Sequence, residues 1–216
     1  MAGPNDIKRA VRSVKGISMQ TTFSSSQGLA HSSGELYTRS LPVRAAAIVS
    51  ATLFVAVCAH ISVPLPFTPV PLTMQDLAVL LVGLVLDPID GMVALALYLA
   101  EGAAGMPVFN PQGLGGMAQL LGPTGGFLLA YPLVAAVCGW GARRLRFKSA
   151  FARAVTGCVF ASAVLFGFGA TWLAQYTHVS ANAVLQMAVY PFLPGNIVKI
   201  VAASGIYSSL SHWRRS

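Results

Sequence analysis

The sequence predicts an all-α membrane protein, a bundle of six transmembrane helices whose N- and C-termini are both cytoplasmic. Of its 216 residues, 55% are hydrophobic and only 9% are charged, whereas soluble domains carry about 25% charged residues. Several apolar runs approach the roughly 20 residues that span a bilayer. The formal net charge of +8 comes from basic clusters in the N-terminal region or beside the ends of apolar runs. This pattern is typical of cytoplasmic anchoring and does not indicate a nucleic-acid partner.

Residues 1–40 form a basic tail that is rich in Ser and Thr. Such a composition cannot bury a core, so we expect this tail to be disordered. A transit peptide has the same composition, and that alternative stays open. Residues 41–216 are expected to form the six-helix transmembrane substrate-binding domain.

Turn-forming residues separate the first three apolar runs. The first predicted span covers residues 43–63, and a proline-rich loop follows it. Because proline lacks an amide donor, this loop must lie outside a helix. The next two runs, 72–86 and 92–104, are separated by Asp-Pro and Asp-Gly pairs. These pairs are turn formers and predict a tight helical hairpin.

The second half of the chain supplies three more spans. A glycine-rich connection over residues 105–126 leads to the fourth span at 127–142, and a basic turn leads to the fifth at 151–176. The sixth apolar region starts near residue 181, is interrupted by Pro and Gly at 191–195, and continues to residue 210. With a cytoplasmic N-terminus, the three outer connections contain no Lys or Arg, which agrees with the charge asymmetry of membrane proteins.

Of the 14 Lys and Arg residues, Lys199 alone lies away from the predicted inner side. A charge within the membrane is costly and indicates a functional role. Irregular backbone at membrane depth is tolerated only where protein buries it or where it lines a wet cavity. The outer connections rich in Pro and Gly therefore predict the mouth of a cavity, with plain connecting loops as the alternative.

Lys199 is expected one turn into a helix that starts at Pro194 and Gly195, with Asn196 on the same helical face. The free N–H groups at a helix start and the lysine charge together suit an anion. The predicted guest is a small carboxylate ligand that enters from outside. The alternative is a structural ion pair between Lys199 and Glu101, which should lie at the same depth.

Asp76 has a local explanation in the sequence. The stretch Thr73–Asp76 fits a capping box at the start of the second helix, where the helix dipole favours an acid. In the first span, Ala47, Ser50 and Ala51 form a face of small residues that allows close helix approach. The partner of that face is either a neighbouring helix of the same bundle or another membrane subunit.

Motifs for catalysis and cofactor binding are absent from the sequence. It contains no P-loop, no H-E-x-x-H and no G-x-S-x-G, and no nucleophile stands with a base. The three cysteines fit neither a disulfide framework nor a metal site and are expected to be packing residues. The sequence therefore predicts neither an enzyme nor a metal site nor a bound cofactor.

Four motifs, in this order along residues 43–210, carry a family resemblance. "PVPLTMQDLAVLLVGLVLDP", "YLAEGAAGMPVF", "LLGPTGGFLLAYPL" and "PFLPGNIVKI" together resemble the BioY family, the biotin-binding substrate-capture subunit (S component) of energy-coupling factor importers. The resemblance implies a multi-pass protein of the cell membrane that captures biotin at its outer face. It also implies two partners, a transmembrane coupling subunit and a pair of ATPases, which agrees with the missing P-loop. The face of Ala47, Ser50 and Ala51 resembles the surface on which such subunits dock their coupling partner.

The resemblance also assigns site residues. It implies that Lys199 holds the biotin carboxylate and that Asn196 makes a polar contact nearby. The family usually has P-G-D at this point, whereas here Asn196 replaces the acid, and asparagine can still pair with a ureido ring. The proline-rich and glycine-rich loops would close over the ligand. The remaining expected substrate contacts are Asn110, Gln112, Glu101, Tyr98 and Gln75.

A second hypothesis is a self-sufficient secondary transporter of another small carboxylate or vitamin. It would be coupled to an ion gradient, and Asp76 and Glu101 would be its proton or sodium sites. Transporters of that kind commonly contain inverted repeats, and no such repeat is visible in this sequence.

Overall fold

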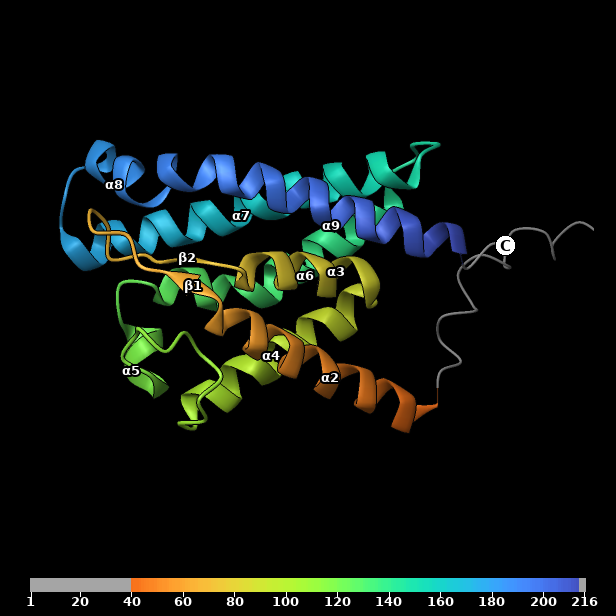
Figure 1. The fold of residues 1–216 in the computed structure, drawn as a ribbon, viewed down its shortest axis with the longest axis horizontal. Helices are drawn as coiled ribbons and strands as arrows, with labels where there is room; N and C mark the ends of the chain where they lie inside the picture. Colours follow the sequence, from red (N-terminus) through yellow and green to blue (C-terminus); the bar gives the residue numbers. More distant parts are fainter. Residues whose placement is uncertain (1–39, 214–216) are drawn as a thin grey trace, which may run out of the picture. The chain divides into compact units, whose positions relative to one another are not determined.

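The computed structural model describes residues 40–213, and in this range the chain is mostly helical (Figure 1). The predicted all-α class is confirmed except for a ribbon of two very short strands, β1 (Ser62–Val63) and β2 (Leu72–Thr73), which pair antiparallel. Residues 1–39, which make up nearly all of the predicted tail, lie outside the described residues. The expected disorder and its transit-peptide alternative therefore stay predictions.

The helices follow the predicted apolar runs, with ends that differ by a few residues. The short helix α5 inside the glycine-rich connection was not expected. The helices are α2 (Leu41–His60), α3 (Gln75–Val85), α4 (Pro88–Ala103), α5 (Gly116–Leu121), α6 (Gly125–Arg144), α7 (Ala150–Thr177), α8 (Ala181–Ala188), the 3-10 turn η1 (Tyr190–Phe192) and α9 (Leu193–Trp213).

Four helical stretches of the described chain are long and apolar enough to cross a membrane. They are α2, α6, α7 and the continuous stretch from α8 through α9. The helices α3 and α4 have 11 and 16 residues, about 17 and 24 Å at 1.5 Å per residue, which is shorter than a bilayer core of about 30 Å. The chain is thus a helical protein with several membrane-spanning helices, and the count of six spans stays a prediction.

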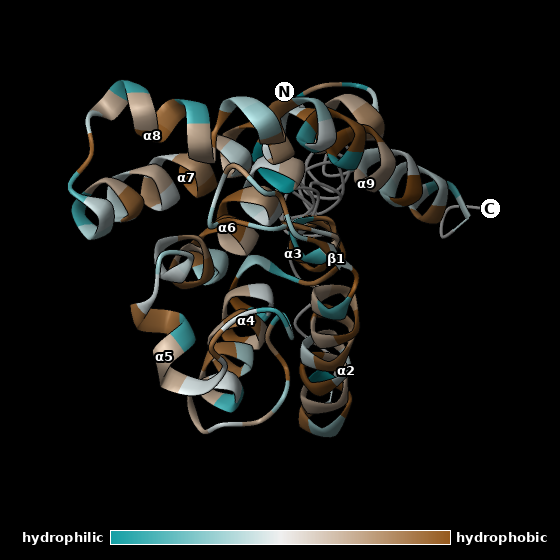
Figure 2. Ribbon diagram, turned by 60° about the vertical axis from the view of Figure 1, so that its left-hand side comes forward, coloured by the Kyte–Doolittle hydropathy of each residue, from teal (hydrophilic) through white to brown (hydrophobic). Residues whose placement is uncertain are grey.

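Helix α2 is apolar along much of its length (Figure 2), and many of its apolar side chains are exposed. Leu53 is 66% exposed and Val57 is 58% exposed, while Val55 and Ala59 on the opposite face are fully buried. A helix that exposes such side chains suits a lipid environment better than water. The same face of α2 therefore supports its assignment as a span.

The predicted hairpin between the second and third runs is confirmed. Helix α3 ends at Val85 and α4 begins at Pro88. Pro88 occupies the first turn of α4, where its missing N–H costs nothing and its fixed φ favours the helix. The Asp-Pro pair therefore ends one helix and starts the next within two residues.

Helix α6 lies at the centre of the bundle and packs against α7, α4 and α3. Glycines allow this close packing. A Cβ on Gly83 would lie 2.6 Å from the carbonyl oxygen of Ala135, and one on Gly141 would lie 2.7 Å from the Cα of Gly157. Small residues at helix crossings let backbones approach closely, as membrane helices require.

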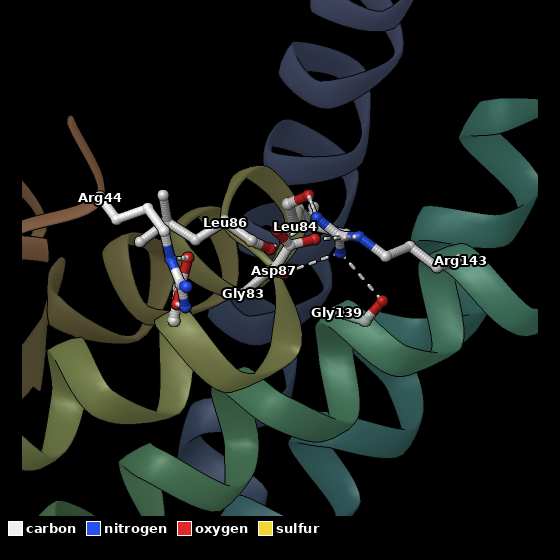
Figure 3. Close-up of polar contacts among 8 residues, drawn as sticks. Arg44, Gly83, Leu84, Leu86, Asp87, Gly139 and Arg143 are labelled. Atoms are coloured by element: carbon white, nitrogen blue, oxygen red, sulfur yellow. Dashed lines mark hydrogen bonds and ion pairs between the residues drawn. The ribbon is translucent and has the colours of Figure 1, made fainter. Parts of the chain in front are cut away.

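Arginines clamp the end of the bundle where α2 begins and α3 turns into α4 (Figure 3). Arg44 on α2 pairs with Asp90 on α4 at 2.5 Å. Arg143 on α6 donates to the carbonyl oxygen of Leu86 at 2.6 Å and lies 3.6 Å from Asp87. Through these contacts the arginine occupies the C-terminal end of α3, where unpaired carbonyls and the helix dipole favour a cation.

The interruption in the last apolar region lies slightly earlier than expected. Helix α8 ends at Ala188, η1 covers Tyr190–Phe192, and α9 already begins at Leu193. Pro194 therefore lies inside the first turn of α9, a position that tolerates proline. As a consequence Lys199 lies in the second turn of α9, one or two residues further from the helix start than predicted.

Candidate functional site

The buried ammonium of Lys199 is held by the start of α3. Its Nζ donates to the carbonyl oxygen of Thr73 at 2.6 Å and to Oδ2 of Asp76 at 2.8 Å. Lys199 is only 7% exposed, and a buried charge is tolerated when it is paired and hydrogen-bonded. The lysine thus joins the beginning of α3 to α9.

Glu101 is not the partner of Lys199, which corrects the expected structural ion pair. Its Oε1 instead accepts a hydrogen bond from the hydroxyl of Thr52 on α2 at 3.3 Å. The two carboxylates differ because Asp76 follows the ribbon and opens α3, which packs against α9. Glu101 lies near the end of α4, which packs against α2.

The predicted capping box is not formed. The hydroxyl of Thr73 accepts from the N–H of Gln75 at 3.3 Å, but the carboxylate of Asp76 makes no return bond to the backbone of Thr73. Asp76 turns away to Lys199 and also accepts from the Tyr131 hydroxyl on α6 at 3.0 Å. A buried ammonium without a counter-charge is costly, whereas a backbone N–H at a helix start can be satisfied in other ways, so the tertiary contact prevails over the local one.

Asn196 shares a buried face of α9 with Lys199, as the spacing of three predicted. Asn196 is 7% exposed, and its Oδ1 accepts from the hydroxyl of Ser162 on α7 at 3.3 Å. Asn196 therefore links α9 to α7, whereas Lys199 links α9 to α3.

A cavity of about 50 Å³ lies beside this ion pair, between α3, α6 and α7 and beneath the proline-rich loop. Phe127, Phe166 and Phe192 are among its apolar lining. Its polar lining consists of Thr73, Gln75, Asp76, Asn110, Gln119, Thr124 and Tyr131.

A second hollow of about 380 Å³ opens above the cavity, between the proline-rich and glycine-rich loops. Pro71, Asn110, Gln119 and Thr124 line both spaces. The small inner cavity is therefore the floor of a larger outer hollow, and the latter falls in the volume range typical of ligand sites.

Ser62, just before the proline-rich loop, is bonded to the glycine-rich loop at this place. It lies in β1, and its hydroxyl contacts Oδ1 of Asn110 at 2.9 Å and the side-chain amide of Gln112. Residues from connections about fifty positions apart along the chain thus meet over the cavity. The predicted closure of the proline-rich and glycine-rich loops over a ligand stays a prediction.

The family assignment follows from a comparison with known proteins. Residues 25–216 match the family model described as "BioY family". The chain belongs to the BioY family.

Individual BioY relatives cover most of the chain. A "Probable biotin transporter BioY" of Pyrococcus horikoshii is 38% identical over 70% of this chain and 87% of its own length. The "Biotin transporter BioY2" of Lactococcus lactis is 33% identical over 82% of this chain and 94% of its own length. A crystal structure of the S-component for biotin from an ECF-type ABC transporter superposes with a TM-score of 0.71. It covers 81% of this chain and 95% of that protein at 23% identity, so the two share a fold.

The expected substrate contacts of this BioY chain divide into two groups. Gln75 and Asn110 line the inner cavity, and Asn110 and Gln112 line the outer hollow. The other four expected contacts are not among the lining residues: Lys199, Asn196, Tyr98 and Glu101. Of these, Lys199 is connected to the cavity through Asp76, and Tyr98 through Gln75.

Sequence reasoning missed five polar residues that line the inner cavity, namely Thr73, Asp76, Gln119, Thr124 and Tyr131. Asp76 was assigned to a helix cap, although an acid at membrane depth is itself a signal of function. Tyr131 lies near the outer end of the predicted fourth span, where an aromatic residue is common at the membrane interface and gives no signal of a site. Gln119 and Thr124 lie in the glycine-rich stretch, where neither spacing nor periodicity distinguishes them from other loop residues.

The small-residue face of α2 is divided between the interior and the surface. Ala51 is buried, Ala47 is half-buried and Ser50 is exposed. The helix packs against α4 and α3, so Ala51 contributes to the bundle itself. Ser50 is the member of this face that is accessible to another subunit, and docking there stays a prediction.

Proposed function

We propose that this chain is the membrane subunit that captures biotin at the outer face of the cell membrane for uptake. Membership of the BioY family supports this proposal, and the fold is shared with an S-component for biotin. The observation that carries it is the aromatic and polar cavity beside a buried Lys199–Asp76 pair, under a ligand-sized hollow. Biotin is the transported substrate, so no resident cofactor is required. The chain is a transport protein and not an enzyme.

The chemistry of biotin matches the groups around the cavity. Its ureido ring offers two N–H donors and one carbonyl acceptor, its sulfur ring is apolar, and its side chain ends in a carboxylate. Amide, hydroxyl and aromatic side chains line the cavity. Lys199 remains the proposed contact of the carboxylate and Asn196 a polar contact nearby. The ligand carboxylate must then exchange places with Asp76, because Asp76 already neutralises the lysine in this structure.

The loops must separate before biotin can bind. A cavity of about 50 Å³ accommodates one or a few waters rather than a bicyclic ligand. The outer hollow is large enough, but Ser62 in β1 is bonded to Asn110, which lines both the hollow and the inner cavity. We therefore infer that biotin first occupies the outer hollow and that the Ser62 contacts break as it moves inward.

The proposed topology has six spans with both termini in the cytoplasm. Arg44, Arg143 and the basic turn after α6 lie at the end of the bundle where α3 turns into α4, and Lys199 lies toward the opposite end of α3. Positive charges favour the cytoplasmic side, which supports this orientation. Coupling to a transmembrane subunit and an ATPase pair follows from the family resemblance. The proposed contact face on α2 consists of Ala47, Ser50 and Ala51.

The secondary-transporter hypothesis is not favoured. It needs Asp76 and Glu101 as ion sites, but the first is paired with Lys199 and the second is bonded to Thr52. In addition, the relatives of this chain are named as biotin transporters BioY.

The proposal is tested by the binding of radiolabelled biotin to the purified protein in detergent, with other water-soluble vitamins as competitors. We expect saturable biotin binding that unlabelled biotin alone displaces. Lys199→Met, combined with Asp76→Asn so that no lone carboxylate remains, should weaken binding by about tenfold or more. Lys148→Met, in the exposed basic turn, is the matched control and should bind as the wild type does.

Two outcomes would overturn parts of this proposal. A wild-type protein that ignores biotin but retains another vitamin would refute the substrate. A folded double variant with unchanged affinity would refute Lys199 as a ligand contact and leave it a structural residue.

A further inference from the structure

Gln75 is oriented by a tyrosine behind it. Gln75 opens α3, is 3% exposed and lines the inner cavity. Its Nε2 donates to the hydroxyl of Tyr98 at 2.9 Å, and that hydroxyl donates to the carbonyl oxygen of Val108 at 2.9 Å. Tyr98 is fully buried and is not among the lining residues. The tyrosine therefore acts on the cavity through Gln75 and not by touching its contents.

The direction of this chain of bonds is determined by Val108. A backbone carbonyl can only accept, so the single hydroxyl proton of Tyr98 must go to Val108. The hydroxyl can then only accept from Gln75, which places the amide nitrogen of Gln75 toward Tyr98. Its Oε1 consequently lies on the other side, and no described residue bonds to it. Gln75 thus carries an unused acceptor at the cavity.

The glycine-rich loop orients the amide of Asn110 so that its oxygen is bonded and its nitrogen is free among the described residues, the reverse of Gln75. Its Oδ1 accepts from the backbone N–H of Gln112 at 3.1 Å and from the Ser62 hydroxyl at 2.9 Å. A backbone N–H can only donate, so the atom that faces it must be the amide oxygen. The Nδ2 of Asn110 has no bond to any described residue. Asn110 is 6% exposed and lines both spaces, so it offers an unused donor.

We propose that Gln75 and Asn110 recognise a urea-like group by its hydrogen-bond polarity. Oε1 of Gln75 accepts from a ring N–H, and Nδ2 of Asn110 donates to the carbonyl oxygen. Tyr98 is a positioning residue that keeps Gln75 in the accepting orientation. The inference rests on the proposed function for the identity of the ligand, and it explains how the cavity selects biotin from analogues of the same size.

Selection of this kind is strong because the groups are buried. An analogue that cannot donate leaves Oε1 of Gln75 desolvated and unpaired, and unpaired buried polar groups produce larger discrimination than lost apolar contacts. Removing the Tyr98 hydroxyl keeps Gln75 in place but allows its amide to turn over. The preference of the protein for ligands with a ring N–H over ligands without one should then fall by a larger factor than the affinity for biotin.

The first test compares biotin with analogues methylated at a ring nitrogen, using competition against labelled biotin on the full-length protein. The wild type should prefer biotin by about tenfold or more. In Tyr98→Phe, which keeps the ring that packs edge-on against Phe109, this preference should fall by about threefold or more. In Gln75→Met it should nearly vanish. Tyr207→Phe on α9, outside both spaces, should keep the wild-type preference.

The second test reverses the polarity of Asn110. In 2-iminobiotin a cationic group presents donors where biotin presents its carbonyl. Asn110→Asp keeps the acceptor for Gln112 and Ser62 but replaces the free donor by an acceptor. We expect it to shift the ratio of the two affinities toward 2-iminobiotin by about tenfold. Asn182→Asp, the same charge change on the exposed start of α8, should leave the ratio unchanged.

The possible results separate this inference from the proposed function. If the wild type binds no biotin, the proposed function fails. If the wild type binds biotin but Gln75→Met retains the preference over methylated analogues, the role of Gln75 is refuted. An unchanged preference in folded Tyr98→Phe refutes the positioning role, and an unchanged ratio in Asn110→Asp refutes the donor. Should Tyr98→Phe not fold, Gln75→Met and Asn110→Asp still decide the matter.

Discussion

At the scale of single residues, the Lys199–Asp76 pair explains how a charge is kept inside an apolar bundle. The side chains of Lys199 and Asp76 are 9% and 25% exposed, and Tyr131 and the carbonyl of Thr73 complete their hydrogen bonds. Removing one member of such a pair leaves an uncompensated charge, whereas removing both is much less costly. The pair therefore links α3 to α9, and its ammonium is the positive charge that a ligand carboxylate would contact.

The stability of the pair can be measured with a double-mutant cycle. Lys199→Met alone should lower the free energy of unfolding by about 3 kcal/mol, because Asp76 is left without its cation. Lys199→Met combined with Asp76→Asn should recover most of that loss. Thermal unfolding in detergent provides the measurement. Equal destabilisation of the single and double variants would contradict a direct interaction.

The same pair makes a prediction about affinity. If Lys199 contacts the biotin carboxylate, Asp76 competes with the ligand for the ammonium. Asp76→Asn should then tighten biotin binding by about tenfold, which corresponds to about 1.4 kcal/mol. Titration calorimetry on the purified variant measures this. Weaker binding would instead mean that Asp76 itself contacts the ligand.

At the scale of elements, α3 is a short helix that contributes residues to the site and is held by side-chain contacts at both ends. Its first residues supply Gln75 and Asp76, and its last carbonyls receive the guanidinium of Arg143. The arginine also contacts Asp87. A helix of 11 residues is marginally stable in isolation. The side-chain contacts at its two ends therefore hold it in place and position the wall of the cavity.

Arg143 and Arg144 are neighbours with different expected roles. Arg143→Met leaves the carbonyls at the end of α3 without their donor and should lower the free energy of unfolding by about 3 kcal/mol. Arg144→Met alters an exposed side chain and should change stability by less than about 0.5 kcal/mol. Unfolding midpoints of the two variants, measured side by side, decide the question. Similar midpoints would show that the contacts of Arg143 carry no net stability.

The contacts of the glycine-rich loop should also affect the rates at which biotin binds and dissociates. Gln112→Ala removes one contact of Ser62 while the bond from Ser62 to Asn110 remains. Looser loops should raise the association and dissociation rates of biotin together, by about threefold to tenfold. Met106→Ala, an exposed change in the same connection, is the control for stopped-flow or filter-binding measurements. Rates that match the control would show that the loops do not limit entry.

At the scale of the whole molecule, charge divides the bundle into two ends. The ion pairs of Arg44 and Arg143 lie at the end with the α3–α4 turn. The strands β1 and β2 lie toward the other end (Figure 1), and residues at the start of α3 line the cavity there. Lys199 lies at the cavity end, where it contacts Thr73 and Asp76 at the start of α3. A bundle with this division should insert with its basic end in the cytoplasm.

Cysteine labelling in intact cells tests this orientation. With Cys58 replaced by Ala, Phe67→Cys in the proline-rich loop should react with a membrane-impermeant maleimide from outside. Lys148→Cys in the basic turn should react only after permeabilisation. Both positions are exposed in the structure, so access alone does not distinguish them. The reverse pattern of labelling would invert the proposed topology.

From sequence alone, the apolar runs and their turns determined the helices. Apolar run length and Pro or Gly punctuation act locally, so the hairpin at Pro88 and the buried face of Asn196 and Lys199 were predictable. The partner of Lys199 was decided only by tertiary structure, because Asp76 lies 123 residues away along the chain. Local rules assigned that acid to a helix cap, and the pairing with a buried ammonium prevailed. The orientations of Gln75 and Asn110 likewise depend on neighbours that no sequence period reveals, because hydrogen-bond direction is determined by the groups that fold beside them.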